Sequence, residues 1–103
     1  MTTFFAAGYS LELFNIRNEH GALRAIRCWG EAEDEHQHLT LWFIPGEPMP
    51  RVARAEDGRW EASFPLGQFE PLADMLRYEG LVHVTLAEPD RVMLQATTNE
   101  SPQ

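Results

Sequence analysis

Turn-forming residues divide this chain into short segments, and their spacing is the feature that most limits how it can fold. Such residues cluster at 18–21, 32–35, 45–48, 56–58 and 88–90. Most of the segments between these clusters have the length of a strand rather than of a helix. This close and regular spacing is typical of antiparallel strands joined by short turns, so we expect a sheet-rich fold.

The clearest strand covers residues 38–44, where alternation gives two apolar faces. One face carries Leu39, Leu41 and Phe43, and the other carries Thr40, Trp42 and Ile44. A strand that is apolar on both faces is usually central in its sheet. We therefore expect it to be covered on each side.

Two hairpins are predicted from alternating segments on either side of a turn. In the first, 51–55 and 59–64 flank the turn that contains Gly58. Its inward side chains are those of Trp60, Ala62 and Phe64. In the second, 82–86 and 92–96 are joined by Pro89 and Asp90, which we interpret as a tight two-residue turn.

The segment 22–32 fits either a helix or a strand, because its apolar residues match both periods. We favour a strand that forms a hairpin with 10–17. A helix would crowd acidic side chains at its negatively polarised C-terminal end. Those acids are Glu31, Glu33, Asp34 and Glu35.

One helix is predicted near 68–79, with Leu72, Met75 and Leu76 on its buried stripe. Together these elements predict an α+β fold in one domain over 1–103. We expect a curved or half-closed antiparallel sheet of about six or seven short strands, with the helix packed on one face and followed by a C-terminal hairpin. The ends at 1–9 and 98–103 are expected to be loosely ordered.

The chain is acidic along its whole length. Sixteen acidic residues face eight basic ones, all of them arginine, for a formal net charge of −8. Such a surface repels phosphate backbones, so we expect no nucleic-acid partner. The charge favours either a basic protein partner or simple solubility. Arginine in place of lysine is typical of GC-rich codon usage, so we expect a bacterial source.

Several kinds of chemistry are excluded by residues that the chain lacks. Without lysine there is no Schiff base and no phosphate-binding Gly-Lys-Ser/Thr loop. With Cys28 alone there is no cysteine-ligated zinc site or internal disulfide. We also see no signal peptide and no apolar run long enough for a bilayer. We expect no membrane association and a cytoplasmic location.

Two histidines close to a run of acids form a candidate metal site. His36 and His38 are two residues apart, so on a strand they share one face. With Glu35 they offer two imidazoles and a carboxylate, which suit zinc, nickel or copper. The other interpretation, which we favour, is a solvated acidic turn. We therefore expect no cofactor, with a divalent metal as the alternative.

The three tryptophans, Trp29, Trp42 and Trp60, fall on neighbouring predicted strands. If the helix covers one face of the sheet, a tryptophan group on the other face could line an apolar concavity. Such a surface accepts a small ligand, a peptide or a partner subunit. The alternative, which we favour, is that all three fill the core of a small barrel.

The remaining candidates have a structural interpretation that we favour. Cys28 lies beside Arg27 but shares the face of Ile26, so we expect a buried, inert thiol. The proline-rich segment 44–50 is expected to cross between two parts of the sheet, although its Met49 would suit a contact surface. His83 lies on an outward face and is interpreted as structural or solvated, so no catalytic residue is assigned.

We therefore expect a non-catalytic protein-binding or regulatory module, which binds a partner protein or associates with itself. One alternative is a small metal-binding protein or enzyme that uses His36 and His38. The other is a carrier that holds a small apolar ligand against tryptophan side chains.

Overall fold

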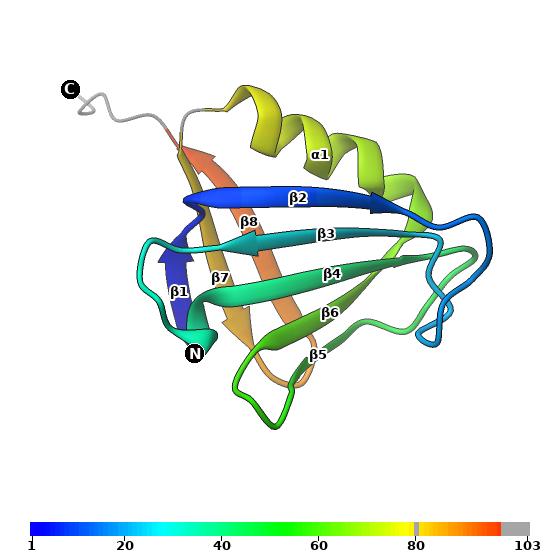
Figure 1. The fold of residues 1–103 in the computed structure, drawn as a ribbon, viewed down its shortest axis with the longest axis horizontal. Coiled ribbons are helices and arrows are strands. Elements are labelled where there is room, and N and C mark those ends of the chain that lie inside the picture. The colour runs from blue at the N-terminus through cyan, green and yellow to red at the C-terminus, as the bar shows by residue number, and fades with distance from the viewer. Residues whose placement is uncertain (80, 98–103) are drawn as a thin grey trace.

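The structure, a computed structural model, describes residues 1–79 and 81–97, apart from the side chains of Glu35 and Thr97. Within this range there are eight strands and one α-helix, so the predicted α+β class is confirmed (Figure 1). The expected loose end at 98–103 lies outside the described residues. The strands are β1 (Thr2–Phe5), β2 (Gly8–Leu13), β3 (Arg24–Trp29), β4 (His38–Ile44), β5 (Arg51–Arg54), β6 (Trp60–Pro65), β7 (Leu81–Ala87) and β8 (Arg91–Thr97).

The strands form two sheets rather than the single sheet that we predicted. A five-stranded sheet has the order β2-β3-β4-β6-β5, and a three-stranded sheet has the order β1-β7-β8. All neighbours are antiparallel except β4 and β6, which are parallel, so the prediction of a purely antiparallel sheet was wrong at this pair. The cause is the proline-rich connection after β4. It carries the chain past the position of β6 to the sheet edge, and β6 then returns between β4 and β5.

The segment for which helix and strand competed is the strand β3. It pairs with β2 on one side and β4 on the other, with Ile26 opposite both Leu11 and Leu41. These three side chains pack in or against the core. The predicted hairpin of 22–32 with the preceding segment is therefore confirmed, and it begins at Gly8.

The helix α1 (Phe69–Tyr78) follows a short 3₁₀ turn at Leu66–Gln68 and agrees with the helix predicted near 68–79. Its buried side chains are Phe69, Leu72, Ala73 and Leu76. The Phe69 ring meets Phe43 of β4 edge-on, with ring centroids 5.3 Å apart. This contact fixes the start of the helix against the centre of the five-stranded sheet.

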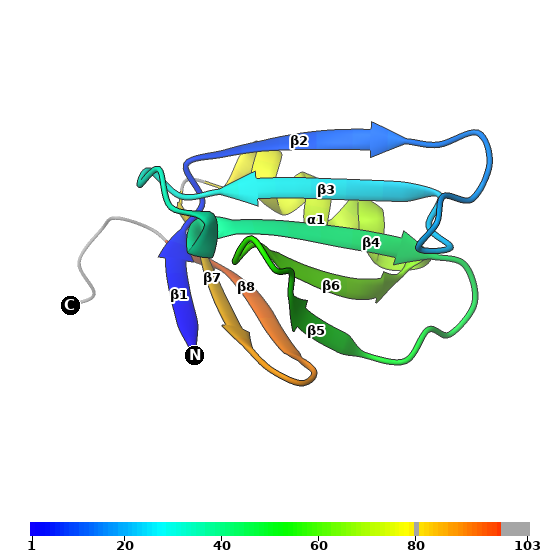
Figure 2. The ribbon, with the colours of Figure 1, turned by 60° about the horizontal axis from the view of Figure 1, so that its bottom comes forward.

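One main core holds the two sheets and the helix together. The helix and the three-stranded sheet lie on the same face of the five-stranded sheet (Figures 1 and 2). The fully buried residues of this core include Ile26, Leu41 and Phe43 from the larger sheet and Val84 and Leu86 from β7. The other face of the larger sheet, which we call the outer face, is covered by no helix or sheet in the part of the chain that the structure describes. Trp42 of the segment 38–44 is nevertheless buried on this face, in a small cluster with Ala22 and Ala25. The predicted cover on each side therefore comes from the helix and the smaller sheet on one face and from the turn that carries His20 on the other.

Two local predictions also need correction. The expectation of a loosely ordered end at 1–9 does not describe Thr2–Phe5, which pairs with β7 and places Phe4 opposite Val84 in the core. The turn between β7 and β8 has three residues instead of two, because Ala87 pairs with Arg91. Alternation alone gives the strands of a hairpin but not its exact register.

Candidate functional site

Trp42 lies at the centre of the outer face, where the ring of His20 and the guanidinium of Arg27 lie against its indole. Trp42 is only 7% exposed, although no helix or strand that the structure describes covers it. The His20 ring stacks on it, with centroids 4.2 Å apart and an interplanar angle of 15°. The Arg27 guanidinium carbon lies 5.4 Å from the Trp42 ring centroid. The Trp42 Nε1–H is buried and has no hydrogen-bond partner among the described residues.

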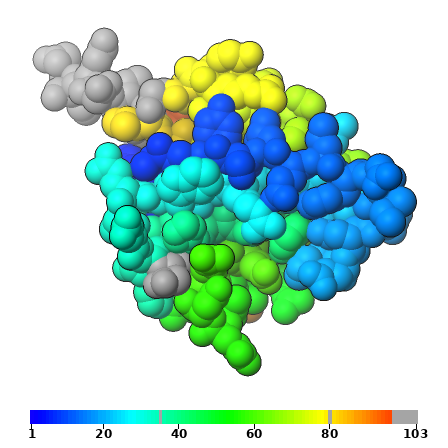
Figure 3. All heavy atoms as spheres, in the orientation of Figure 1, coloured from blue at the N-terminus to red at the C-terminus, as the bar shows by residue number. Residues whose placement is uncertain are grey.

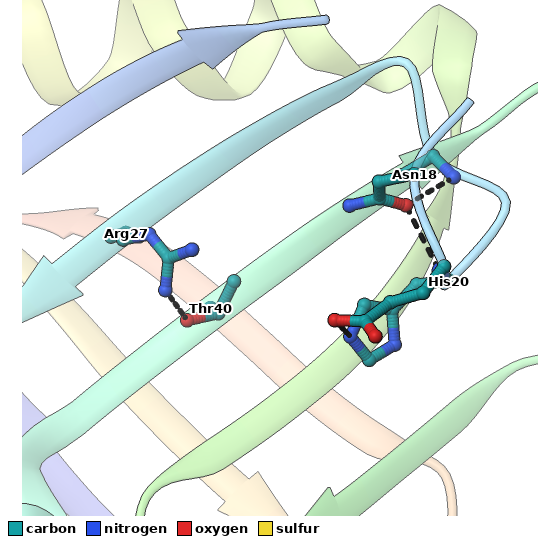
Figure 4. A network of polar contacts seen from close by, with 6 residues as sticks. Asn18, His20, Arg27 and Thr40 are labelled. Carbon is teal, nitrogen blue, oxygen red and sulfur yellow. Dashed lines mark hydrogen bonds and ion pairs between the residues drawn. The ribbon is translucent and has the colours of Figure 1, made fainter. Parts of the chain in front are cut away.

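His20 is placed over Trp42 by a tight turn between β2 and β3. The Asn18 side-chain oxygen accepts hydrogen bonds from the backbone N–H groups of His20 and Ala22, at 3.0 and 2.9 Å (Figure 4). Gly21 takes a positive φ of 77°, a conformation that glycine adopts without steric cost. Its N–H donates to the Asn18 carbonyl at 2.9 Å. The sequence Asn-Glu-His-Gly thus builds a rigid turn that carries the imidazole.

Arg27 is held on the outer face by partners on both neighbouring strands. Its Nη1 donates to the Thr40 hydroxyl of β4 at 3.1 Å (Figure 4), and its Nε donates to the Glu12 carboxylate of β2. These contacts keep the guanidinium over Trp42, and the ion pair neutralises the charges of Arg27 and Glu12. Arg27 therefore has a structural role at this site.

Beside Trp42 the outer face contains a cavity of about 250 Å³, which we call the Trp42 pocket. It lies between the turn at 18–22 and the β5–β6 hairpin, which stand on this face in Figure 3. Its walls include Glu19, His20, Trp42, Arg51, Glu61 and Ser63. The parallel pairing of β4 and β6 puts Ser63 next to Trp42, and β5 adds Arg51 opposite Ser63.

The pocket contains charges of both signs that remain unpaired. Within the described residues, neither Arg51 nor Glu61 takes part in an ion pair, and neither side chain makes a hydrogen bond. The register places Glu61 opposite Ala53, so the two charges are diagonal neighbours on adjacent strands. This contrasts with Arg27 and Glu12, which do pair on the same face.

A second surface of interest is the face of the three-stranded sheet that points away from the core, which we call the apolar face. Register places Phe5 beside His83 and Met93 beside Thr85 on it. Phe5 and Met93 are each 52% exposed, and the Phe5 ring packs on His83 with centroids 4.8 Å apart. A shallow hollow of about 470 Å³ runs along it, lined in part by Met1, Thr85 and Met93.

The three tryptophans do not share one surface. Trp29 and Trp42 lie on the outer face, whereas Trp60 is 4% exposed in the core, with Arg54 stacked at 5.0 Å from its ring centroid. Trp29 lies over Gly8, where an added Cβ would approach its ring to 2.7 Å. A residue larger than glycine would therefore require the indole to shift.

The two candidate metal-binding histidines make different contacts. His36 lies in a 3₁₀ turn (Glu35–Gln37), and its Nδ1 accepts a hydrogen bond from Arg54, since a guanidinium can only donate. His38 stacks on Trp29, with ring centroids 6.5 Å apart. Among the side chains that the structure describes, no three His, Cys, Asp or Glu residues form a group that could hold a metal ion. The side chain of Glu35, the third predicted ligand, lies outside that set.

Cys28 is a free cysteine within the core, as predicted. Burial raises the pKa of its thiol to about 12, because the thiolate would lose its hydration. Met49 is exposed in the proline-rich crossover, where the prediction of a crossover is confirmed. His83 is half-buried on the apolar face.

Several residues of the two surfaces were missed by sequence reasoning. Phe5 was assigned to a loose end, although Phe4 and Phe5 after two threonines have the composition of a strand. The predicted inward set of Trp60, Ala62 and Phe64 leaves Glu61 and Ser63 on the opposite face of the strand, which is where they lie. Their approach to Arg51 follows from the predicted hairpin, but their approach to Trp42 depends on the parallel strand pair, for which no local signal exists.

Comparisons of the chain with protein families, with curated proteins and with solved structures find no match. No helix of the described residues is long and apolar enough to cross a membrane. Function is therefore inferred from the side chains of the Trp42 pocket and the apolar face.

Proposed function

We propose that this protein is a non-catalytic binding module that docks a partner protein on its apolar face. The observation that carries the proposal is the pair of half-exposed side chains, Phe5 and Met93, on one sheet face that no other described element covers. Phenylalanine and methionine are enriched in the centres of protein interfaces, where they bury large apolar areas. Leaving both in water costs free energy that a partner would recover.

The charges at the ends of this face indicate the chemistry of the partner. Glu31 lines a hollow with Phe5 at one end, and Asp90 lines the hollow of Met93 at the other. Arg91 is the single arginine on the three strands. Together with the net charge of −8, this arrangement fits a partner with an apolar centre and basic residues around it. The acidic surface would also speed the encounter at low salt.

Such a module would work in the cytoplasm and without nucleic acid. A buried free cysteine and the absence of other cysteines suit a reducing compartment. The acidic surface supports a protein rather than a polyanion as the partner.

Selection of displayed peptides against the purified protein tests this proposal without knowledge of the natural partner. We expect enriched peptides to carry an apolar centre flanked by arginine or lysine. The binding of one such synthetic peptide, followed by fluorescence polarisation, should weaken as salt is raised. The double variant Phe5→Ser, Met93→Ser should bind it at least about tenfold more weakly. Tyr78→Ser, which removes an exposed aromatic from the helix, is the matched control.

Three results would overturn the proposal. The first is the absence of any enriched peptide. The second is equal binding to the double variant while circular dichroism shows both proteins folded. The third is a dimer in sedimentation experiments that grows with salt and is lost in the double variant. Salt would favour self-association because it screens repulsion between two copies of net charge −8, so that result would assign the face to a second copy of this chain.

A further inference from the structure

The Trp42 pocket differs from the apolar face in its chemistry and lies on the other sheet. Its volume of about 250 Å³ corresponds to roughly eight water-sized groups at ~30 Å³ each. That is room for a molecule with the number of heavy atoms of a small free amino acid. It is too little for a dinucleotide or a long acyl chain.

The walls of the pocket argue against a purely apolar ligand. Arg51 and Glu61 would lose hydration beneath such a ligand without gaining a partner, at a cost that apolar contact with Trp42 does not offset. The earlier expectation of an apolar molecule held against tryptophan is therefore not the one that this geometry favours.

The unpaired charges also argue against a ligand of a single sign. An anion would be attracted by Arg51 but repelled by Glu61, and a cation would be attracted by Glu61 but repelled by Arg51. A ligand that carries both signs meets each wall favourably. Ser63 and the stacked pair of His20 and Trp42 add a hydroxyl and flat aromatic surface.

We propose that the Trp42 pocket binds a small zwitterion of the free amino-acid class. The ligand carboxylate is held by the Arg51 guanidinium, which can donate two parallel hydrogen bonds. The ligand ammonium is held by the Glu61 carboxylate on the adjacent strand. His20, fixed by the Asn18 turn, closes the side of the pocket opposite the β5–β6 hairpin.

Titration of the isotope-labelled protein with alanine and glutamine tests the proposal. The indole N–H signal of Trp42, assigned with a Trp42→Phe variant, reports on the pocket separately from the other two tryptophans. We expect both amino acids to shift this signal in a saturable way. Acetate, methylamine and N-acetylalanine amide, which lack one or both charges, should leave it unchanged at the same concentrations.

Arg51→Gln and Glu61→Gln should each weaken binding at least about tenfold, since each removes one of the two charged contacts. Arg59→Gln and Glu56→Gln remove the same kinds of charge from the β5–β6 turn, outside the pocket walls. These control variants should leave the affinity unchanged. The remaining signals of each variant show whether its fold is intact.

The proposal is overturned if alanine and glutamine leave the Trp42 signal unchanged. It is also overturned if acetate or methylamine binds as tightly as alanine, which would assign the pocket to a singly charged ligand. Equal weakening by the turn variants would show that net charge, rather than the pocket, governs binding.

Discussion

Cys28 shows how strongly the core of this small protein excludes water. The thiol lies on β3, an interior strand of the larger sheet, and the exposed fraction of Cys28 is 1%. Burial raises the pKa of this thiol from 9.0 to about 12 because the thiolate is not solvated there. Reactive cysteines need an accessible, electropositive environment, so Cys28 serves as a small apolar side chain.

This pKa shift predicts a loss of stability in alkaline solution. The folded state keeps the thiol proton to a higher pH than the unfolded state, so its contribution is complete below pH 9 and declines as pH rises towards 12. The slope from this group is at most about 1.4 kcal/mol per pH unit. Urea unfolding of the wild type and of Cys28→Ala across this range measures it. The free energy of the wild type should fall more steeply, and parallel curves would contradict the assignment.

At the same scale, alternation correctly predicted that Trp42 points away from Leu41. The apolar residues on both faces also predicted that each face would be covered, and Trp42 is indeed buried. They did not identify what covers it, because the ring of His20 belongs to a turn more than 20 residues earlier in the chain. The face of a side chain follows from strand geometry. Its burial depends on what the rest of the chain places above that face.

At the scale of elements, the turn at 18–22 positions one wall of the Trp42 pocket, because its backbone hydrogen bonds hold His20 over Trp42. One side-chain oxygen, that of Asn18, satisfies two backbone N–H groups. Asparagine and aspartate both supply such an acceptor, whereas alanine supplies none.

Asn18→Ala should therefore lower the free energy of unfolding by about 1–2 kcal/mol, since two hydrogen bonds are lost at a partly buried turn. The His20 ring should also leave Trp42, which becomes more exposed and fluoresces at longer wavelength. Urea unfolding and the emission maximum measure both effects. Asn18→Asp keeps the acceptor and should restore most of each. If the aspartate variant is as unstable as the alanine variant, the acceptor is not what holds the turn.

The elements that could be predicted from sequence are those with local signals. Alternation on both sides of Gly58 and the apolar stripe near Leu72 are read within about ten residues, and both correspond to observed elements. The pairing of β1 with β7 and the parallel pairing of β4 with β6 bring together strands that are distant in the sequence. No local sequence pattern predicts which of these strands pair. The pocket depends on the second of these pairings, so its residues could not be grouped from sequence.

At the scale of the whole molecule, two sheets and a helix share one main core. Leu86 of the smaller sheet and Leu41 of the larger one are both fully buried in it. A backbone hydrogen bond also joins the two sheets: the Val52 N–H of β5 donates to the Pro89 carbonyl in the β7–β8 turn at 2.8 Å. A protein built in this way should unfold as one unit.

Leu86→Ala tests this cooperativity, because all three tryptophans lie on the larger sheet and Leu86 lies on the smaller one. Removing a fully buried leucine side chain costs about 2–5 kcal/mol. If the core is shared, tryptophan fluorescence should report that whole loss in urea, with a transition that coincides with the one seen by circular dichroism. Met93→Ala, on the exposed face of the same small sheet, should change the midpoint little. A tryptophan transition that stays at the wild-type midpoint in Leu86→Ala, while the amide protons of β7 exchange faster, would show instead that the three-stranded sheet unfolds by itself.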